Sequence, residues 1–181
     1  VILASTNVRT TITGNYVDNS FIEWTNEYEA LPAFNNQFSF GGLTVVGNSF
    51  MASDVASWFR WITVKPFGAG HFIQGLTVSG NVFRCVNGTI DRPETVDTSF
   101  ATLDNSRMRN VLFSGNIFNG VTQNIENPVF MQFDQATAAN VWTVTPGAAL
   151  PFGGWARNVE ALIAEGPITG PANERRSDMP Y

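Results

Sequence analysis

The segment Gly42-Leu-Thr-Val-Val-Gly-Asn-Ser-Phe50 decides the fold, because copies of it recur at a nearly constant spacing. The other copies are Arg9-Thr-Thr-Ile-Thr-Gly-Asn-Tyr-Val17, Gly75-Leu-Thr-Val-Ser-Gly-Asn-Val-Phe83 and Asn110-Val-Leu-Phe-Ser-Gly-Asn-Ile-Phe118. Their Gly-Asn pairs begin at residues 14, 47, 80 and 115, which gives a period of 33, 33 and 35 residues. A degenerate fifth copy, Arg157-Asn-Val-Glu-Ala-Leu-Ile-Ala-Glu-Gly166, keeps the glycine and loses the asparagine. A repeat of this length indicates a stacked, repetitive architecture.

Within each copy, apolar and polar residues alternate with the period of a β-strand. One inward position holds Thr10, Leu43, Leu76 and Val111, the next holds Ile12, Val45, Val78 and Phe113, and the outward position between them holds Thr11, Thr44, Thr77 and Leu112. Each copy is therefore a short strand that ends at a Gly-Asn corner. The pattern predicts an all-β parallel solenoid of four to five coils, each about 33 residues long. Stacking would align Asn15, Asn48, Asn81 and Asn116 as a ladder, and Phe50, Phe83 and Phe118 as an internal aromatic stack.

A second strand is expected in each coil, ten to twenty residues after the corner. The candidates are Phe21–Thr25, Phe59–Thr63, Phe100–Asp104 and Phe130–Asp134. Their alignment predicts one inward column and two outward columns. The inward column consists of Trp24, Trp61, Leu103 and Phe133. The outward columns consist of Glu23, Arg60, Thr102 and Gln132, and of Thr25, Ile62, Asp104 and Asp134. The Pro- and Gly-rich segments Leu31–Ser39, Lys65–His71, Asp91–Asp97 and Ala136–Gly154 are expected to be loops.

The ends of the sequence complete the predicted organisation. We expect a solenoid domain over residues 1–169 and an exposed tail over residues 170–181, which contains two prolines. The opening residues Val1-Ile2-Leu3-Ala4 resemble the middle of a strand, so we expect a fragment or processed piece of a longer chain; removal of a tag from a complete domain is the alternative.

Composition excludes several classes of protein. Charged residues make up 14% of the chain and the net charge is −5, which argues against a nucleic-acid partner. A single cysteine, Cys85, excludes an internal disulfide framework, and a single histidine, His71, excludes any site that needs two histidines. We expect Cys85 to be a small buried residue and His71 to be structural. No apolar run approaches the length of a membrane span, so no membrane insertion is expected, and no metal or cofactor is predicted.

The repeated strand, Gly-Asn corner and Phe resemble the right-handed parallel β-helices of the pectate-lyase-like superfamily, over roughly residues 8 to 166. The closing segment Arg157–Pro167 more narrowly resembles the β-helix spike and tail-fibre proteins of tailed phages and phage-derived particles. The resemblance implies a right-handed coil and carbohydrate as the ligand or substrate class, without deciding between binding and cleavage. The acidic clusters that pectate lyases and polygalacturonases carry on their first strand are absent, since Thr11, Thr44, Thr77 and Leu112 stand there.

Two aspartates form the best candidate catalytic pair. If the second-strand alignment holds, Asp104 and Asp134 lie on adjacent coils with Cα atoms about 5 Å apart. Two carboxylates at that distance raise one pKa, as an acid and nucleophile pair requires. The alternative is a pair of solvated aspartates that cap local backbone groups.

Three residues form the candidate carbohydrate-binding site. Trp58 shares the outward parity of Arg60, so its ring could stack on a sugar while the guanidinium binds a carboxylate or sulfate. Glu23 is expected beside Arg60 on the neighbouring coil. The alternatives are that Trp58 packs under the Leu31–Ser39 loop or a neighbouring subunit, and that Glu23 and Arg60 form an ordinary surface ion pair.

The resemblance implies a β-helical virion spike or tail-fibre domain that binds cell-surface polysaccharide, located on a virion or outside the cell, and the missing acidic clusters favour binding over cleavage. A polysaccharide lyase or glycoside hydrolase acting on an acidic polysaccharide is the first alternative, and a structural spacer is the second. Because the ends of a short solenoid expose unpaired strands, we expect a homo-oligomer, with a trimer favoured, or contact with other virion proteins. Leu112, Ile62 and Trp58 are candidates for the face that such an assembly buries.

Overall fold

The structure is a computed structural model that describes residues 1–137, 139, 141–170 and 172–176. The chain divides into two compact units. The first comprises residues 1–129 and 147–155, and the second comprises residues 130–146 and 156–181. The predicted boundary between residues 169 and 170 lies inside the second unit.

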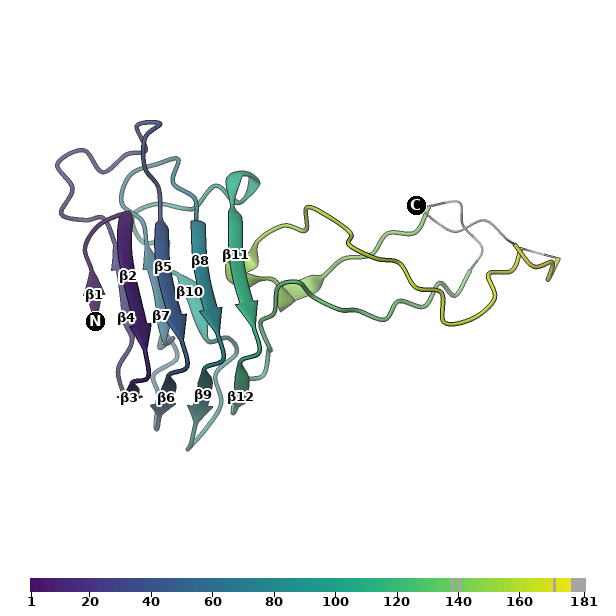
Figure 1. The fold of residues 1–181 in the computed structure, drawn as a ribbon, viewed down its shortest axis with the longest axis horizontal. Helices are drawn as coiled ribbons and strands as arrows, with labels where there is room; N and C mark the ends of the chain where they lie inside the picture. Colours follow the sequence, from purple (N-terminus) through teal and green to yellow (C-terminus); the bar gives the residue numbers. More distant parts are fainter. Residues whose placement is uncertain (138, 140, 171, 177–181) are drawn as a thin grey trace. The chain divides into compact units, whose positions relative to one another are not determined.

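The first unit is a parallel β-solenoid of about three turns, with about 33 residues per turn (Figure 1). It consists of three four-stranded sheets, in which successive coils lie side by side. Sheet A contains β1 (Ile2–Leu3), β4 (Ile22–Thr25), β7 (Ile62–Lys65) and β10 (Glu94–Val96). Sheet B contains β2 (Asn7–Thr13), β5 (Gly41–Val46), β8 (Gln74–Ser79) and β11 (Arg109–Ser114). Sheet C contains β3 (Tyr16–Asp18), β6 (Ser49–Ala52), β9 (Val82–Cys85) and β12 (Ile117–Asn119).

Helical structure in the described residues is confined to short 3-10 turns. They are η1 (Asn105–Arg107), η2 (Gly147–Ala149) and η3 (Pro151–Gly153). Among the residues that the structure describes, no helix has the length and apolar character needed to cross a lipid bilayer.

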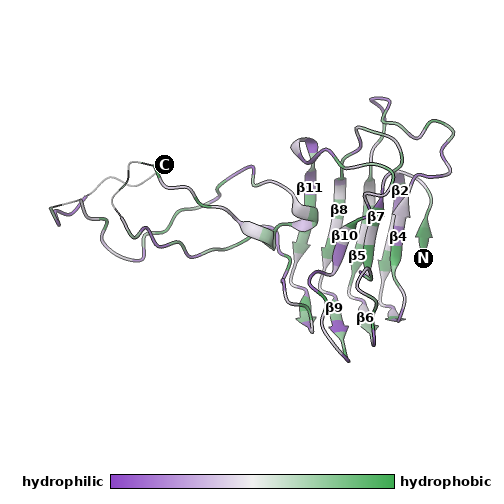
Figure 2. Ribbon diagram, turned by 180° about the vertical axis from the view of Figure 1, so that it is seen from behind, coloured by the Kyte–Doolittle hydropathy of each residue, from purple (hydrophilic) through white to green (hydrophobic). Residues whose placement is uncertain are grey.

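Sheets B and C confirm the register read from the repeat. Thr11 pairs with Thr44, Thr44 with Thr77, and Thr77 with Leu112, all in parallel. Leu43, Val45, Leu76 and Val78 are buried, as their inward parity predicts. Figure 2 shows the resulting alternation of hydrophobic and hydrophilic residues along the strands.

The asparagine ladder at the Gly-Asn corners is confirmed. The Oδ1 atom of Asn81 accepts hydrogen bonds from the backbone N–H of Asn48 at 2.9 Å and from its Nδ2 at 3.0 Å. Asn81 in turn donates from Nδ2 to Asn116 Oδ1 at 3.0 Å and to the carbonyl of Val45 at 2.9 Å. Gly80, which precedes Asn81, has φ +61°, a left-handed conformation that glycine adopts without steric cost. Each corner therefore satisfies the polar groups of its neighbour along the solenoid axis.

The aromatic stack beside the ladder is also confirmed. The ring centroids of Phe50 and Phe83 lie 5.0 Å apart with an angle of 9° between the planes. Phe83 and Phe118 lie 5.6 Å apart at 11°. Trp24 and Trp61 are fully buried, as predicted, so the core combines aliphatic columns with aromatic rings.

Sheet A differs from the sequence prediction in its register. Glu23 pairs with Thr63, so the alignment that placed Glu23 beside Arg60 was wrong by three residues. The cause is that Phe59 and Trp61 are buried in a corner before β7 and do not belong to the strand. The same shift corrects Ile62, which is buried in the core and is not an outward residue.

The sequence prediction also misplaced the last strand of sheet A. It is β10, inside the segment Asp91–Asp97 that was expected to be a loop, whereas Phe100–Asp104 contains no strand. The inward position of β10, opposite Ile62, holds the charged residue Glu94, which hid the apolar alternation. The fifth copy, Arg157–Gly166, and the candidate Phe130–Asp134 form no strand either, which is why the solenoid has fewer turns than expected.

Candidate functional site

An exposed tryptophan stands at the start of sheet A. Trp58 lies in the turn before β7 and has 67% of its surface exposed. The strand parity from which its outward position was predicted does not apply there, because Arg60, which shares that parity, is largely buried. Its ring packs edge-on against Phe21, with centroids 5.9 Å apart, and lies 6.2 Å from Phe59. Because Phe59 is itself buried, the indole is supported from below while its remaining surface faces solvent. We call Phe21, Trp58, Phe59, Arg60 and Asp91 the aromatic corner.

Arg60 is a fixed part of this corner. Its Nη1 atom donates to the carbonyls of Ser57 at 3.0 Å and Phe59 at 2.5 Å, and its Nη2 atom forms an ion pair with Asp91. The Arg60 side chain is largely buried, whereas that of Asp91 is mostly exposed. The predicted partner Glu23 is replaced by Asp91 of the following coil, which sequence reasoning missed because Asp91 was assigned to a loop. The corner therefore contains a solvated carboxylate, held by Arg60, and an exposed aromatic ring.

The outward face of sheet A extends from this corner. One row consists of Glu23, Thr63 and Thr95 on β4, β7 and β10, which are all partly exposed. Glu23 therefore lies beside Thr63 of β7 and is not paired with Arg60. The row presents hydroxyl and carboxylate groups of the kind that hydrogen-bond to polyhydroxylated ligands.

A second aromatic group lies at the other end of β7. The rings of Phe67 and Phe100 stack with centroids 4.2 Å apart, and the Nζ atom of Lys65 lies 5.3 Å from the centroid of Phe100. Phe100 is 60% exposed. The sequence did not predict this group because Phe100 was expected in a strand. The single lysine of the chain, Lys65, was the available sign of an unusual position. The strands between the two groups span roughly 13 Å.

The buried histidine is part of the scaffold beneath this second group. The Nε2 atom of His71 lies 2.7 Å from the carbonyl of Pro32 and its Nδ1 atom lies 3.2 Å from Ser39 Oγ. Asn26, also fully buried, accepts from the backbone N–H of Phe67 at 2.7 Å and donates to Pro32 at 2.9 Å. These bonds join two long loops and fix the backbone of Phe67. The structural interpretation of His71 fits this geometry.

The two candidate catalytic aspartates do not occupy equivalent strand positions. Asp104 precedes η1 and accepts hydrogen bonds from the backbone N–H and the hydroxyl of Ser106, at 3.0 and 2.5 Å. Asp134 lies in the second unit and in no strand. The strand alignment that paired them was therefore wrong, and the observed role of Asp104 is that of a helix-capping residue.

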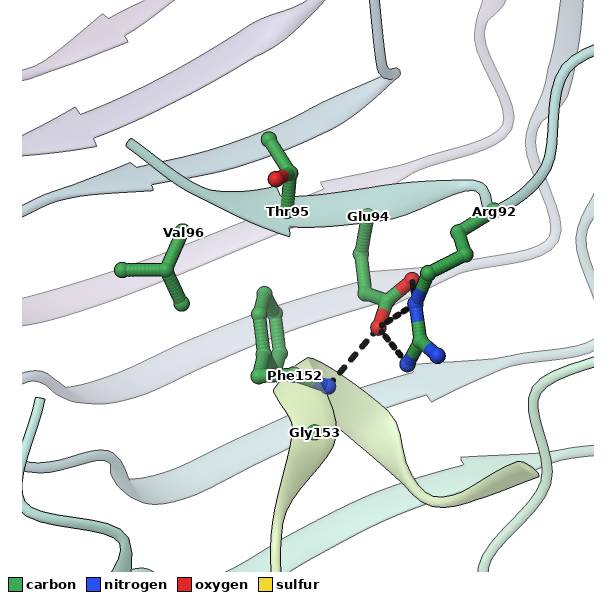
Figure 3. A pocket seen from close by; sticks show the side chains of 6 residues that line it. All are labelled: Arg92, Glu94, Thr95, Val96, Phe152 and Gly153. Carbon is green, nitrogen blue, oxygen red and sulfur yellow. Dashed lines mark hydrogen bonds and ion pairs between the residues drawn. The ribbon is translucent and has the colours of Figure 1, made fainter. Parts of the chain in front are cut away.

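A cavity of about 310 Å³ lies beside β10, the last strand of sheet A (Figure 3). It is lined by Arg92, Glu94, Thr95, Val96, Phe152 and Gly153. The buried Glu94 accepts from Arg92 Nη2 at 2.6 Å and from the backbone N–H of Phe152 at 2.7 Å. Arg92 also donates to the carbonyls of Ala148 and Leu150, both at or below 2.8 Å. Arg92 and Glu94 therefore bind the segment 147–153 to the last coil, which is a structural role.

Burial raises the pKa of Glu94 above its ordinary value, because desolvation of the carboxylate outweighs the opposing effect of Arg92. A folded state that holds this proton more tightly than the unfolded state loses stability as the pH rises through the raised pKa. The Glu94→Gln variant cannot titrate and keeps an acceptor oxygen. We expect the free energy of unfolding of the wild type, relative to this variant, to fall between pH 4 and pH 7.

Urea unfolding of both proteins across this pH range provides the measurement. Because every other titrating group is shared, the difference between the two curves isolates Glu94. A difference that is constant with pH, or that grows in favour of the wild type, would contradict the raised pKa.

In the part of the chain that the structure describes, no three His, Cys, Asp or Glu side chains cluster closely enough to hold a metal ion. Cys85 is buried, and burial raises the pKa of its thiol. Comparison with known protein families, curated proteins and solved structures finds no match to this chain.

Proposed function

We propose that this chain is a β-helical domain of a virion spike or tail fibre that binds cell-surface polysaccharide along the outward face of sheet A. The observation that carries the proposal is the exposed indole of Trp58, held in one orientation by Phe21 and Phe59. Aromatic faces supported in this way present apolar surface at little cost in conformational entropy. The resemblance to phage spike proteins adds the biological setting.

The surroundings of Trp58 support a polar, extended ligand. Asp91 of the aromatic corner and the row of Glu23, Thr63 and Thr95 on sheet A supply acceptors and hydroxyls. The stacked Phe67 and Phe100 with Lys65 give a second aromatic surface and a cation at the opposite end of the strands. A chain of several sugar units could contact both ends, which a single small sugar could not.

The binding test uses an array of bacterial capsular polysaccharides and lipopolysaccharide O-chains. We expect the 181-residue chain to retain at least one of these glycans, and the Trp58→Ala variant to bind it at least about tenfold more weakly, since loss of one stacked ring removes roughly 1.4 kcal/mol. The matched control is Trp155→Ala, which removes an equally exposed tryptophan, 66% against 67%, that lies in no strand and has no described contact with the aromatic corner. Equal losses in both variants, or no binding to any glycan, would contradict the proposal.

The same incubations distinguish binding from cleavage. New reducing ends or absorbance from unsaturated uronates would reveal a hydrolase or a lyase. If Asp104→Asn or Asp134→Asn abolishes such depolymerisation while binding is retained, the substituted residue is catalytic. That result would overturn the non-enzymatic proposal. If the chain neither binds nor cleaves any of these glycans, the remaining interpretation is a rigid spacer.

A further inference from the structure

The turn that follows β9 contains an asparagine with a glycine directly after it. Residues 86–89, which we call the 86–89 turn, are all exposed and belong to no strand. Gly88 has φ +133°, a conformation that residues with a side chain rarely adopt, and apart from its chain neighbours no heavy atom lies within 4 Å of the place of a Cβ. In the part of the chain that the structure describes, no hydrogen bond engages the Asn87 side chain or the backbone N–H of Gly88. These two groups can therefore approach each other without breaking a hydrogen bond.

The chain contains a second Asn-Gly pair, at residues 119 and 120, in very different surroundings. Asn119 is the last residue of β12 and pairs with Arg84 of β9. A Cβ on Gly120 would lie 2.5 Å from the carbonyl oxygen of Cys85, so the neighbouring coil encloses this glycine. The carbonyl of Gly120 also accepts a hydrogen bond from the backbone N–H of Ile90 at 3.0 Å. The same dipeptide is thus held in place at one position and unrestrained at the other.

An asparagine side chain is open to attack by the backbone nitrogen of the next residue. That nitrogen forms a bond to Cγ, the bond from Cγ to the side-chain nitrogen breaks, and ammonia leaves with the proton of the backbone amide. Water then opens the resulting succinimide ring at either carbonyl, which gives aspartate or isoaspartate. The overall reaction consumes water and releases ammonia. Glycine in the next position favours the attack because no Cβ obstructs the approach of its nitrogen.

We propose that Asn87 is a site of spontaneous deamidation and isoaspartate formation in the folded protein, and that Asn119 is protected. Ring closure requires the asparagine backbone to leave the extended conformation. At Asn119 this movement breaks the ladder between β12 and β9, so the strand must first open locally. At Asn87 the turn already lies in solvent, and water reaches both the attacked carbon and the ring that forms.

The fold accommodates the product at Asn87. Isoaspartate adds a carbon to the backbone and a carboxylate to the surface, and both changes fall inside the 86–89 turn. On one side of the modified bond, the backbone N–H of Val86 donates to the carbonyl of Ala52 at 2.9 Å. On the other side, Ile90 is held by Gly120 and forms a parallel bridge with Val121. The modification therefore changes the charge of the turn and leaves the three sheets in place.

The test follows both pairs in one sample. The 181-residue chain is aged at mildly alkaline pH, digested, and mapped by chromatography and mass spectrometry, which separate the asparagine, aspartate and isoaspartate forms of each peptide. We expect Asn87 to convert at least about tenfold faster than Asn119 in the folded chain, since Asn119 reacts only after local opening. In urea, where both pairs are in a flexible chain, the two rates should agree within about threefold. Equal rates in the folded chain, or faster conversion of Asn119, would overturn the proposal.

Two variants provide an independent measurement on the intact protein. Asn87→Gln keeps an amide but needs a larger ring for the same attack, so the acidic form that accumulates in the aged wild type should fall at least about tenfold on ion exchange. Asn119→Gln is the matched control and should leave that form unchanged. Persistence of the acidic form in Asn87→Gln, or an equal reduction in both variants, would overturn the proposal. Because neither readout involves a glycan, its failure is distinct from failure of the proposed binding function.

Discussion

The Asn81→Ala variant is expected to lower the free energy of unfolding by about 3–4 kcal/mol, because it removes a buried side chain that makes four hydrogen bonds. The backbone N–H of Asn48 would lose its partner, and the carbonyl of Val45 would lose the bond from Asn81. Asn48 Nδ2 and Asn116 Oδ1 would each lose one of several bonds. Buried polar groups left without a partner keep their full desolvation cost. Urea unfolding followed by far-UV circular dichroism measures the change.

The matched control is Asn15→Ala at the exposed end of the same ladder. The Asn15 side chain donates only to Asn48 and to the carbonyl of Thr13, so its loss should cost about 1 kcal/mol or less. If the asparagines act as a ladder, the cost of the alanine substitution in free energy of unfolding increases from the exposed end of the ladder to its centre. Equal costs at both positions would show that the stacked asparagines do not stabilise one another.

Replacement of Arg92 by alanine has the second large effect. Glu94 is fully buried, and without Arg92 its carboxylate would lose its ion pair in the core. Removing one partner of a buried ion pair typically costs about 3–5 kcal/mol. The segment 147–153 would also lose the two hydrogen bonds from Arg92 to Ala148 and Leu150. We expect a loss of about 3–5 kcal/mol in the free energy of unfolding at pH 7, with a smaller loss at pH 4 where Glu94 can take up a proton.

Arg109→Ala serves as the control for removal of an arginine. Arg109 is exposed and donates to the half-buried Gln74 on the neighbouring strand at 2.7 Å, so the change should cost at most about 0.5 kcal/mol. Unfolding at pH 7 and pH 4 compares both variants with the wild type. A cost for Arg92→Ala that matches the control, or that does not depend on pH, would contradict the proposed role of the pair.

The candidate site was predictable only in part. Local sequence predicted an exposed Trp58, but from a strand parity that does not apply, because the residue lies in a turn before β7 and Arg60 of the same parity is largely buried. The neighbours of Trp58 could not be predicted, because Arg60 pairs with Asp91, which lies one coil further along the chain. A contact between coils depends on the lengths of the loops between them, and these lengths vary from one coil to the next.

The sequence by itself determined the solenoid, the asparagine ladder and the phenylalanine stack. In a parallel solenoid, residues one period apart occupy the same place on successive coils, so a repeat of 33 residues brings Asn48 onto Asn81 without further information. Alternation then decides which side chains enter the core, as Val45 and Thr44 illustrate.

Only the tertiary structure decided the register of sheet A and the closure of the last coil. Phe59 and Trp61 look like strand residues and instead fill a corner, since a buried aromatic ring is stabilised equally in either place. Glu94 looks like a loop residue and instead ends the inward column of Ile22 and Ile62, because Arg92 and the backbone of Phe152 satisfy its carboxylate. Arg92 lies only two residues from Glu94, but the backbone donor of Phe152 comes from 58 positions further along the chain, and local sequence carries no sign of its approach.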